Sequence, residues 1–115
     1  MTQDDLTIDL VLIDDYLENL GVSIVAKMLA MYEVQSEVYL NDIELALGSE
    51  EQSLWQERCH KMKGAAGSVG MKKVHAHLVA IEKSAAPVSQ KSEFIVKLKA
   101  LNKEAINAFS ELINA

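Results

Sequence analysis

The sequence has little of what small proteins use to reinforce or interrupt a fold. Its 115 residues include a single cysteine, Cys59, so no disulfide can form within the chain. There is one proline, Pro87, and aromatic residues make up only 5% of the chain, while Ala, Leu, Met, Glu and Lys are plentiful. No apolar run approaches the ~20 residues that span a bilayer. These absences exclude an internal disulfide scaffold and predict no transmembrane helix in this sequence, and the composition favours helix.

An excess of positive charge is also absent. The formal net charge is -6 at pH 7, whereas nucleic-acid binding depends on basic residues that neutralise phosphates. We therefore expect no nucleic-acid partner and no insertion into an anionic membrane. Residues 1–5 are acidic and polar and do not resemble a signal peptide. The sequence predicts a cytoplasmic monomer, or a cytoplasmic piece of a longer chain.

What the chain does have is helical periodicity. Half of its residues are hydrophobic, and its length suits one domain, 1–115. Asp9 can cap a first helix, Gly48 can end a second, Gly70 can break a third, and a turn at 85–89 can precede the last. Apolar residues at three- and four-residue steps predict helices at about 9–20, 22–47, 49–69, 71–84 and 90–113.

Four long amphipathic helices with short connections predict an all-α fold, an antiparallel four-helix bundle with a short additional N-terminal helix. The second helix is expected to bury Val25, Met28, Leu29, Tyr32, Ser36, Tyr39, Ile43 and Leu47. The last is expected to bury Phe94, Leu98, Leu101, Ala105, Ala108 and Leu112.

The predicted third helix divides into two unlike faces. At 100° per residue, one face carries Leu54, Trp55, Arg58, Cys59, Met62, Ala65, Ala66 and Val69. The opposite face is polar and carries Ser53, Gln56, Glu57, His60, Lys63, Gly64 and Gly67. Because the apolar face must pack against the core, His60 is expected to point outward.

Two glycines lie within two turns of His60 on this polar face. Glycine costs about 1 kcal/mol relative to alanine inside a helix, so a merely solvated face gains nothing from Gly64 and Gly67. Beside an exposed side chain, however, they leave a flat patch that another protein can approach closely. Lys63 adds a cation near the imidazole. A nucleophile, a positive neighbour and steric clearance together indicate reversible phosphorylation of His60.

The sequence contains no Walker loop and no kinase-type glycine loop after a strand. We therefore expect no ATP site and no autokinase activity, so the chain is not an enzyme by itself. Another domain must donate the phosphoryl group. From these residues alone, a solvated surface histidine remains an equal alternative for His60.

The segment from His60 to Gly70 resembles the core of the histidine-containing phosphotransfer (HPt) domains. Their pattern is a histidine followed by lysine three residues later, glycine four later and glycine ten later, as in His60, Lys63, Gly64 and Gly70. The stretch from Leu12 to Leu29 resembles the family's entry into its second helix, and Ile81-Glu82 resembles its hydrophobic–Glu pair. The glycine-rich version at 64–70 is similar to domains that end hybrid sensor kinases of the anaerobic redox sensor type.

The resemblance implies a carrier in a multistep two-component phosphorelay, which shuttles phosphoryl groups between receiver-domain aspartates. It implies that His60 is the phosphoacceptor, that Lys63 stabilises the phosphate and that Gly64 provides clearance. The implied partners are the receiver domain of a hybrid histidine kinase and a response regulator. Magnesium would belong to the receiver, so no cofactor or metal is expected on this chain. Other residues expected to contact the partner are Gln56, Glu57, Gly67 and Ser68.

Several narrower alternatives stay open. Gln56 could hydrogen-bond the ring nitrogen of His60 that is not phosphorylated, although solvent could do the same. Cys59 is more typical of a small buried hydrophobe than of a reactive thiol. His75 and His77 lack the spacing of a helical metal site. The rim of the docking surface is expected to include Leu6, Ile8 or Val11.

The rival function is a non-catalytic helical adaptor that binds a signalling partner through the same His60 face. Such an adaptor would keep its partner after His60→Gln, whereas a phosphoryl carrier would lose its acceptor.

Overall fold

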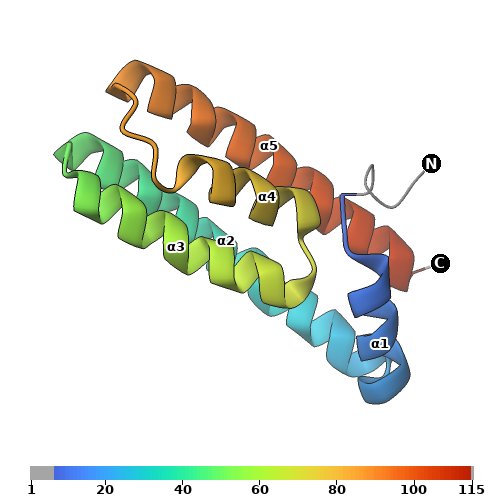
Figure 1. Cartoon of the computed structure of the whole chain (residues 1–115). Coiled ribbons are helices and arrows are strands. Elements are labelled where there is room, and N and C mark those ends of the chain that lie inside the picture. Colours follow the sequence, from blue (N-terminus) through green and yellow to red (C-terminus); the bar gives the residue numbers. More distant parts are fainter. Residues whose placement is uncertain (1–6, 115) are drawn as a thin grey trace.

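Five helices with short connections make up the part of the chain that the computed structural model describes, residues 7–114. They are α1 (Leu10–Leu20), α2 (Val22–Ser49), α3 (Gln52–Val69), α4 (Lys72–Ile81) and α5 (Val88–Ile113). Helices α2 to α5 lie side by side, and α1 packs across the end of the bundle where α2 begins and α5 ends (Figure 1). The predicted all-α bundle with a short N-terminal helix is confirmed.

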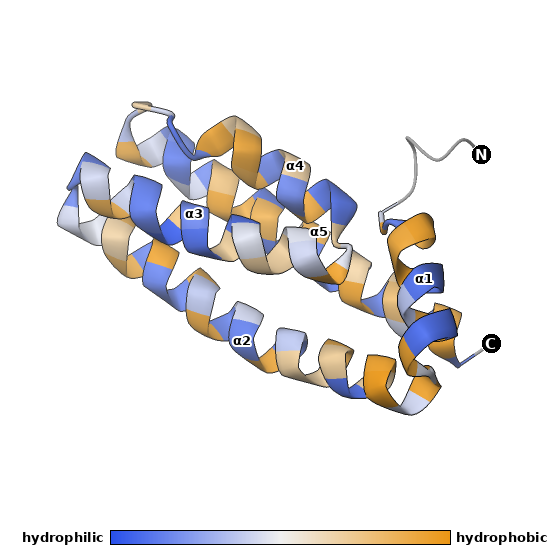
Figure 2. Cartoon of the chain, turned by 60° about the horizontal axis from the view of Figure 1, so that its bottom comes forward, coloured by the Kyte–Doolittle hydropathy of each residue, from blue (hydrophilic) through white to orange (hydrophobic). Residues whose placement is uncertain are grey.

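The bundle is held together by apolar faces that meet in one core. Hydrophobic and hydrophilic residues alternate along each helix (Figure 2), as expected where one side packs and the other is solvated. Full burial of one large apolar side chain contributes about 1.5–3 kcal/mol. The largest fully buried side chains include Trp55, Phe109, Ile13, Ile43 and Met62. The buried line predicted for α2 is confirmed, because its members are buried or half-buried.

Two of the predicted capping residues, Asp9 and Gly70, lie at helix ends, and a third, Gly48, does not. The carboxylate of Asp9 accepts a hydrogen bond from the Leu12 amide at 3.1 Å, and Gly70 ends α3 in a left-handed conformation with φ 82°. Gly48 does not end α2. The helix runs through it to Ser49, and Glu50 takes the left-handed conformation with φ 60°. A helix tolerates an isolated glycine, so Gly48 alone is not a stop.

The buried line predicted for α5 is confirmed by the same measure, because its members are buried or half-buried and pack against the core. Leu98 and Ala105 are fully buried as expected, but the other predicted members are only half-buried. The most deeply buried line is Lys91, Ile95, Leu98, Asn102, Ala105 and Phe109. Two of its members are polar, so a search for apolar residues alone placed the line about one residue away.

Helix α4 is shorter than predicted, and this places a side chain beside the middle of α3. It ends at Ile81 rather than near Ser84, and α5 begins at Val88, directly after Pro87. Ten residues span about 15 Å, so α4 stops partway along the bundle and the connection at 82–87 runs onward to α5 (Figure 1). Glu82 follows the last residue of α4 and comes to lie against α3.

Within residues 7–114, no helix combines the length and the apolar character needed to cross a bilayer.

Candidate functional site

His60 lies on the outer face of α3, as the faces of this helix predict. Trp55, Cys59, Met62 and Ala66 anchor the opposite face in the core. The side chain of His60 is therefore turned to solvent, and 70% of its surface is exposed. An incoming group can reach the imidazole without any rearrangement of the bundle.

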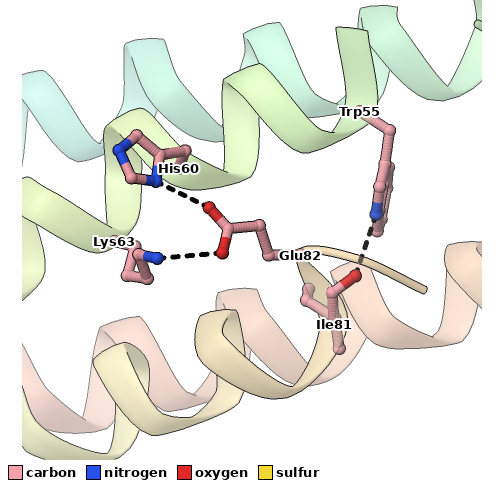
Figure 3. A network of polar contacts seen from close by, with 5 residues as sticks. All are labelled: Trp55, His60, Lys63, Ile81 and Glu82. Atoms are coloured by element: carbon pink, nitrogen blue, oxygen red, sulfur yellow. Dashed lines mark hydrogen bonds and ion pairs between the residues drawn. The ribbon is translucent and has the colours of Figure 1, made fainter. Parts of the chain in front are cut away.

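The exposed imidazole rests on a carboxylate that is nearly buried. Nδ1 of His60 lies 2.7 Å from Oε1 of Glu82, and Nζ of Lys63 donates to Oε2 of the same carboxylate at 2.8 Å (Figure 3). Only 9% of the Glu82 side chain is exposed, whereas 23% of Lys63 is exposed. The end of α4 thus contributes one residue that contacts both functional candidates of α3.

This contact assigns the roles of the two ring nitrogens. The hydrogen bond from Lys63, with a further one from His60, holds the pKa of Glu82 below its usual value of 4.5, so the carboxylate is ionised at neutral pH. An ionised carboxylate only accepts hydrogen bonds, so Nδ1 carries the proton in the contact. In the neutral ring Nε2 then keeps its lone pair. Figure 3 shows this nitrogen on the side of the ring away from Glu82.

The two glycines of the polar face have different roles. A Cβ placed on Gly64 would meet no neighbouring atom within 4 Å, so the surface one turn after His60 is open. A Cβ on Gly67 would lie 3.0 Å from Cδ2 of His75 on α4. Gly67 therefore permits close packing of α3 against α4. Both glycines are exposed, but only Gly64 has open space around it, and clearance for a partner stays a prediction.

Most of the chain matches one protein family. The family model described as Hpt domain matches residues 27–111, which is most of the chain. The chain belongs to the Hpt domain family.

The curated relatives of this Hpt domain are much longer proteins, and only a short segment of each one matches. Aerobic respiration control sensor protein ArcB of Escherichia coli O157:H7 is 35% identical over 65 residues, which is 56% of this chain and 8% of that protein. The ArcB protein of Shigella flexneri is 34% identical over 65 residues, with the same coverage. The match thus spans about a twelfth of the length of these relatives.

Solved structures share the fold of this Hpt domain along nearly its whole length. The histidine-containing phosphotransfer domain of ArcB from Escherichia coli superposes with a TM-score of 0.83, at 23% identity, over 98% of both chains. The solution structure of the same domain gives a TM-score of 0.82 at 23% identity, over 99% of this chain and 96% of the other. At this identity the likeness establishes the common bundle.

The residue that contacts the His60 ring in this Hpt domain differs from the one suggested by the sequence, Gln56. Gln56 is half-buried one turn before the histidine, but it is Glu82 that contacts Nδ1. The resemblance singled out Ile81-Glu82 without giving Glu82 a role. Its 22-residue separation from His60 hides the contact, which exists because α4 ends beside the middle of α3.

The remaining docking candidates occupy mixed positions. Glu57 is exposed and pairs with Arg58 at 2.7 Å and Lys61 at 3.7 Å. Ser68 is exposed, and its carbonyl accepts a hydrogen bond from the Tyr16 hydroxyl at 2.8 Å, which ties α1 to the end of α3. Of the apolar rim residues, 64% of Val11 is exposed but only 5% of Ile8 is, so Ile8 belongs to the core. Leu6 lies outside the described residues.

The other possible reactive side chains have structural surroundings. Cys59 is fully buried, and burial raises the pKa of its thiol to about 12, which suits a small hydrophobe rather than a nucleophile. Nε2 of His77 lies 3.0 Å from the carbonyl oxygen of Phe94, and the ring of His75 packs on Gly67. In the described part of the chain, no three His, Cys, Asp or Glu side chains are grouped to hold a metal.

Proposed function

We propose that this chain is a phosphoryl carrier of a multistep two-component phosphorelay. It accepts a phosphoryl group on Nε2 of His60 from the aspartyl phosphate of one receiver domain and passes it to the aspartate of another. The observation that carries the proposal is an imidazole exposed over 70% of its surface, with Nδ1 bonded to an ionised and nearly buried carboxylate.

The acceptance step follows from the roles of the two nitrogens. The lone pair of Nε2 attacks phosphorus, the N–P bond forms as the P–O bond to the donor aspartate breaks, and the carboxylate leaves. Because Nδ1 keeps its proton, the phosphorylated ring gains positive charge, which the Glu82 carboxylate at 2.7 Å stabilises. In the reverse step the same ring is the leaving group, so the transfer remains reversible.

Lys63 is proposed to stabilise the phosphoryl oxygens. Its ammonium has three N–H donors, and one is directed to Oε2 of Glu82 at 2.8 Å. The others are free to face the charge that accumulates on the equatorial oxygens of the transition state. The bond to Glu82 holds Nζ on the side of α3 where His60 projects, so this cation needs little reordering.

We propose that partner proteins, rather than this chain, provide the phosphoryl donor, the final acceptor and the metal ion. The donor is the receiver domain of a hybrid kinase and the acceptor is a response regulator, with magnesium bound at the receiver aspartate. We infer that the chain neither binds ATP nor phosphorylates itself. The open surface at Gly64, with Gln56 and Glu57 one turn before His60, is proposed to form the face where a receiver docks.

A transfer assay tests the proposal directly. A receiver domain carrying labelled phosphate on its aspartate is mixed with the wild-type chain, with His60→Gln and with His75→Gln as a matched histidine control. We expect label in the wild-type chain and in His75→Gln, and none in His60→Gln. Label in His60→Gln at the wild-type level would refute the assignment. Receiver binding without any transfer to the wild-type chain would favour the adaptor function instead.

A further inference from the structure

The position of Glu82 depends on the way in which α4 ends. The last carbonyls of a helix have no partners within the helix and must find them elsewhere. The carbonyl oxygen of Ile81 accepts hydrogen bonds from the Ser84 amide at 3.0 Å and from Nε1 of Trp55 at 3.0 Å (Figure 3). The carbonyl oxygen of Ser84 accepts from Nε2 of Gln52 at 2.9 Å. Side chains of α3 therefore fix the backbone on both sides of Glu82.

The buried lysine Lys91 holds both of these α3 side chains. Its ammonium, on the first turn of α5, donates to Oε1 of Gln52 at 2.6 Å and lies 4.9 Å from the centre of the Trp55 ring. The bond to Oε1 orients the amide so that Nε2 of Gln52 faces the Ser84 carbonyl. Only 8% of Lys91 is exposed, so its charge depends on the amide oxygen and the aromatic face for stabilisation.

We propose that Gln52, Trp55 and Lys91 form a clamp, called here the α4 clamp, that positions the Glu82 carboxylate and thereby sets the tautomer of His60. The proposal rests on the proposed function of His60 and assigns the clamp residues a positioning role in that reaction. Trp55 and His60 are five residues apart on α3. One helix thus carries both the nucleophile and the two side chains that bond to the backbone on either side of Glu82, while Lys91 of α5 holds those two side chains.

The geometry leaves little tolerance at this point. Glu82 must reach Nδ1 of His60 at 2.7 Å and Nζ of Lys63 at 2.8 Å at the same time. A shift of about 1 Å in the backbone at Ile81 would break at least one of these contacts. A displacement of that size can slow a reaction even when the substituted residue lies far from the reacting atoms. Without the carboxylate, the neutral ring of His60 would shift toward the tautomer that carries its proton on Nε2. In that tautomer Nε2 has no lone pair with which to attack phosphorus.

The first experiment reads the tautomer and involves no phosphate. Nitrogen-15 NMR of the imidazole is recorded at a pH where the ring is neutral, for the wild-type chain, Trp55→Phe, Gln52→Leu and Glu82→Ala. Trp55→Phe keeps an aromatic ring but loses the N–H donor, and Gln52→Leu keeps the size of a residue that is only half-buried. We expect both to move the His60 signals from the Nδ1–H form toward those of Glu82→Ala.

Tyr32→Phe is the matched control for a general loss of stability. The Tyr32 hydroxyl donates to Oδ1 of Asn102 at 2.7 Å between α2 and α5, so this variant also loses a buried hydrogen bond, but away from α4. Its His60 signals should match those of the wild-type chain. Wild-type signals in folded Trp55→Phe and folded Gln52→Leu would overturn the proposal, as would an equal shift in Tyr32→Phe.

The second experiment reads the reaction with phosphoramidate, a small donor that needs no partner protein. Its P–N bond breaks, ammonia leaves and the phosphoryl group binds Nε2. We expect Trp55→Phe and Gln52→Leu to react about threefold or more slowly than the wild-type chain. Neither should slow the reaction further in a Glu82→Ala background, because the clamp acts through Glu82. Additional slowing in that background would refute positioning through Glu82.

The two proposals fail in different ways. If the tautomer shifts as expected but no receiver transfers phosphate to His60, the clamp stands and the relay function does not. If receivers label His60 but the clamp variants keep the wild-type tautomer, the relay function stands and the clamp does not.

Discussion

Glu82 keeps an ionised carboxylate in a nearly buried position because Lys63 and His60 both contact it. A buried carboxylate without such partners would take up a proton at a higher pH. Here the hydrogen bond from Lys63 is the larger influence and that from His60 the smaller one, and together they lower the pKa of Glu82. Lys63, which follows His60 by three residues, thus keeps Glu82 in the ionised state in which it can orient the imidazole.

The lowered pKa of Glu82 predicts a specific loss of stability in acid. In the unfolded chain this carboxyl has a pKa near 4.5, and in the folded chain the value is lower. The contribution of Glu82 to the free energy of unfolding is therefore fully present above about pH 4.5 and is lost as the pH falls through the folded-state pKa. Urea unfolding between pH 3 and 6 should show a smaller acid loss in Glu82→Gln than in the wild-type chain.

Equal acid losses in the two proteins would show that this carboxylate is not stabilised in the folded state. The ionised contact with His60 that orients Nε2 would then be unsupported.

Three of the site residues could be predicted because they lie on one helix. His60, Lys63 and Gly64 are close in sequence, and an angular plot of α3 places them on one face. Glu82 could not be found in this way. Its contact with His60 depends on where α4 ends, and side chains of another helix bond to the backbone there: Trp55 to the Ile81 carbonyl and Gln52 to the Ser84 carbonyl. Neither periodicity nor local capping rules contain that information.

The same limit explains the errors in helix length. The first helix begins where Asp9 caps it and α3 ends at Gly70, because both signals are local. Helix α2 passes Gly48, and α4 stops at Ile81 without a glycine. Local signals thus predicted the ends at Asp9 and Gly70. They missed the end of α4, where the Ile81 carbonyl bonds to Trp55 of α3, and they placed the end of α2 at a glycine that the helix passes through.

The open surface at Gly64 on α3 predicts a separation of folding from transfer. Gly64→Leu places its side chain where no neighbouring atom lies within 4 Å of the Cβ, and leucine favours helix by up to about 1 kcal/mol over glycine. Urea unfolding should show stability equal to or above that of the wild-type chain. Transfer from a phosphorylated receiver should nevertheless slow by about tenfold or more, because the added bulk hinders close approach to His60.

Gly48→Leu is a matched control, because Gly48 is also exposed in a helix with open space around it. It should gain stability in the same way and transfer at the wild-type rate. A folded Gly64→Leu chain that matches Gly48→Leu in transfer would remove the clearance role of Gly64.

The bundle as a whole contains a buried polar network away from the site. Between α2 and α5, the Tyr32 hydroxyl donates to Oδ1 of Asn102 at 2.7 Å, and Nδ2 of Asn102 donates to the Ser36 hydroxyl at 2.9 Å. All three residues are buried. Buried polar groups of this kind require fully satisfied partners, and in the described part of the chain no buried side-chain nitrogen or oxygen lacks one.

This network predicts that Asn102 contributes to stability but not to transfer. Asn102→Ala leaves the Tyr32 hydroxyl and the Ser36 hydroxyl without their amide partner, which costs about 1–3 kcal/mol for a buried group. Urea unfolding should show that loss. Under conditions where the variant remains folded, His60 should accept phosphate at the wild-type rate, and a large fall in that rate would connect the network to the site.

The account of the whole molecule depends on which nitrogen carries the phosphoryl group. The most direct measurement is a long-range proton–nitrogen NMR spectrum of the nitrogen-15-labelled chain after phosphorylation by a receiver domain. We predict one phosphohistidine, at His60, with phosphorus on Nε2 and the proton retained on Nδ1. Phosphorus on Nδ1 of His60, or on His75 or His77 instead, would contradict the account.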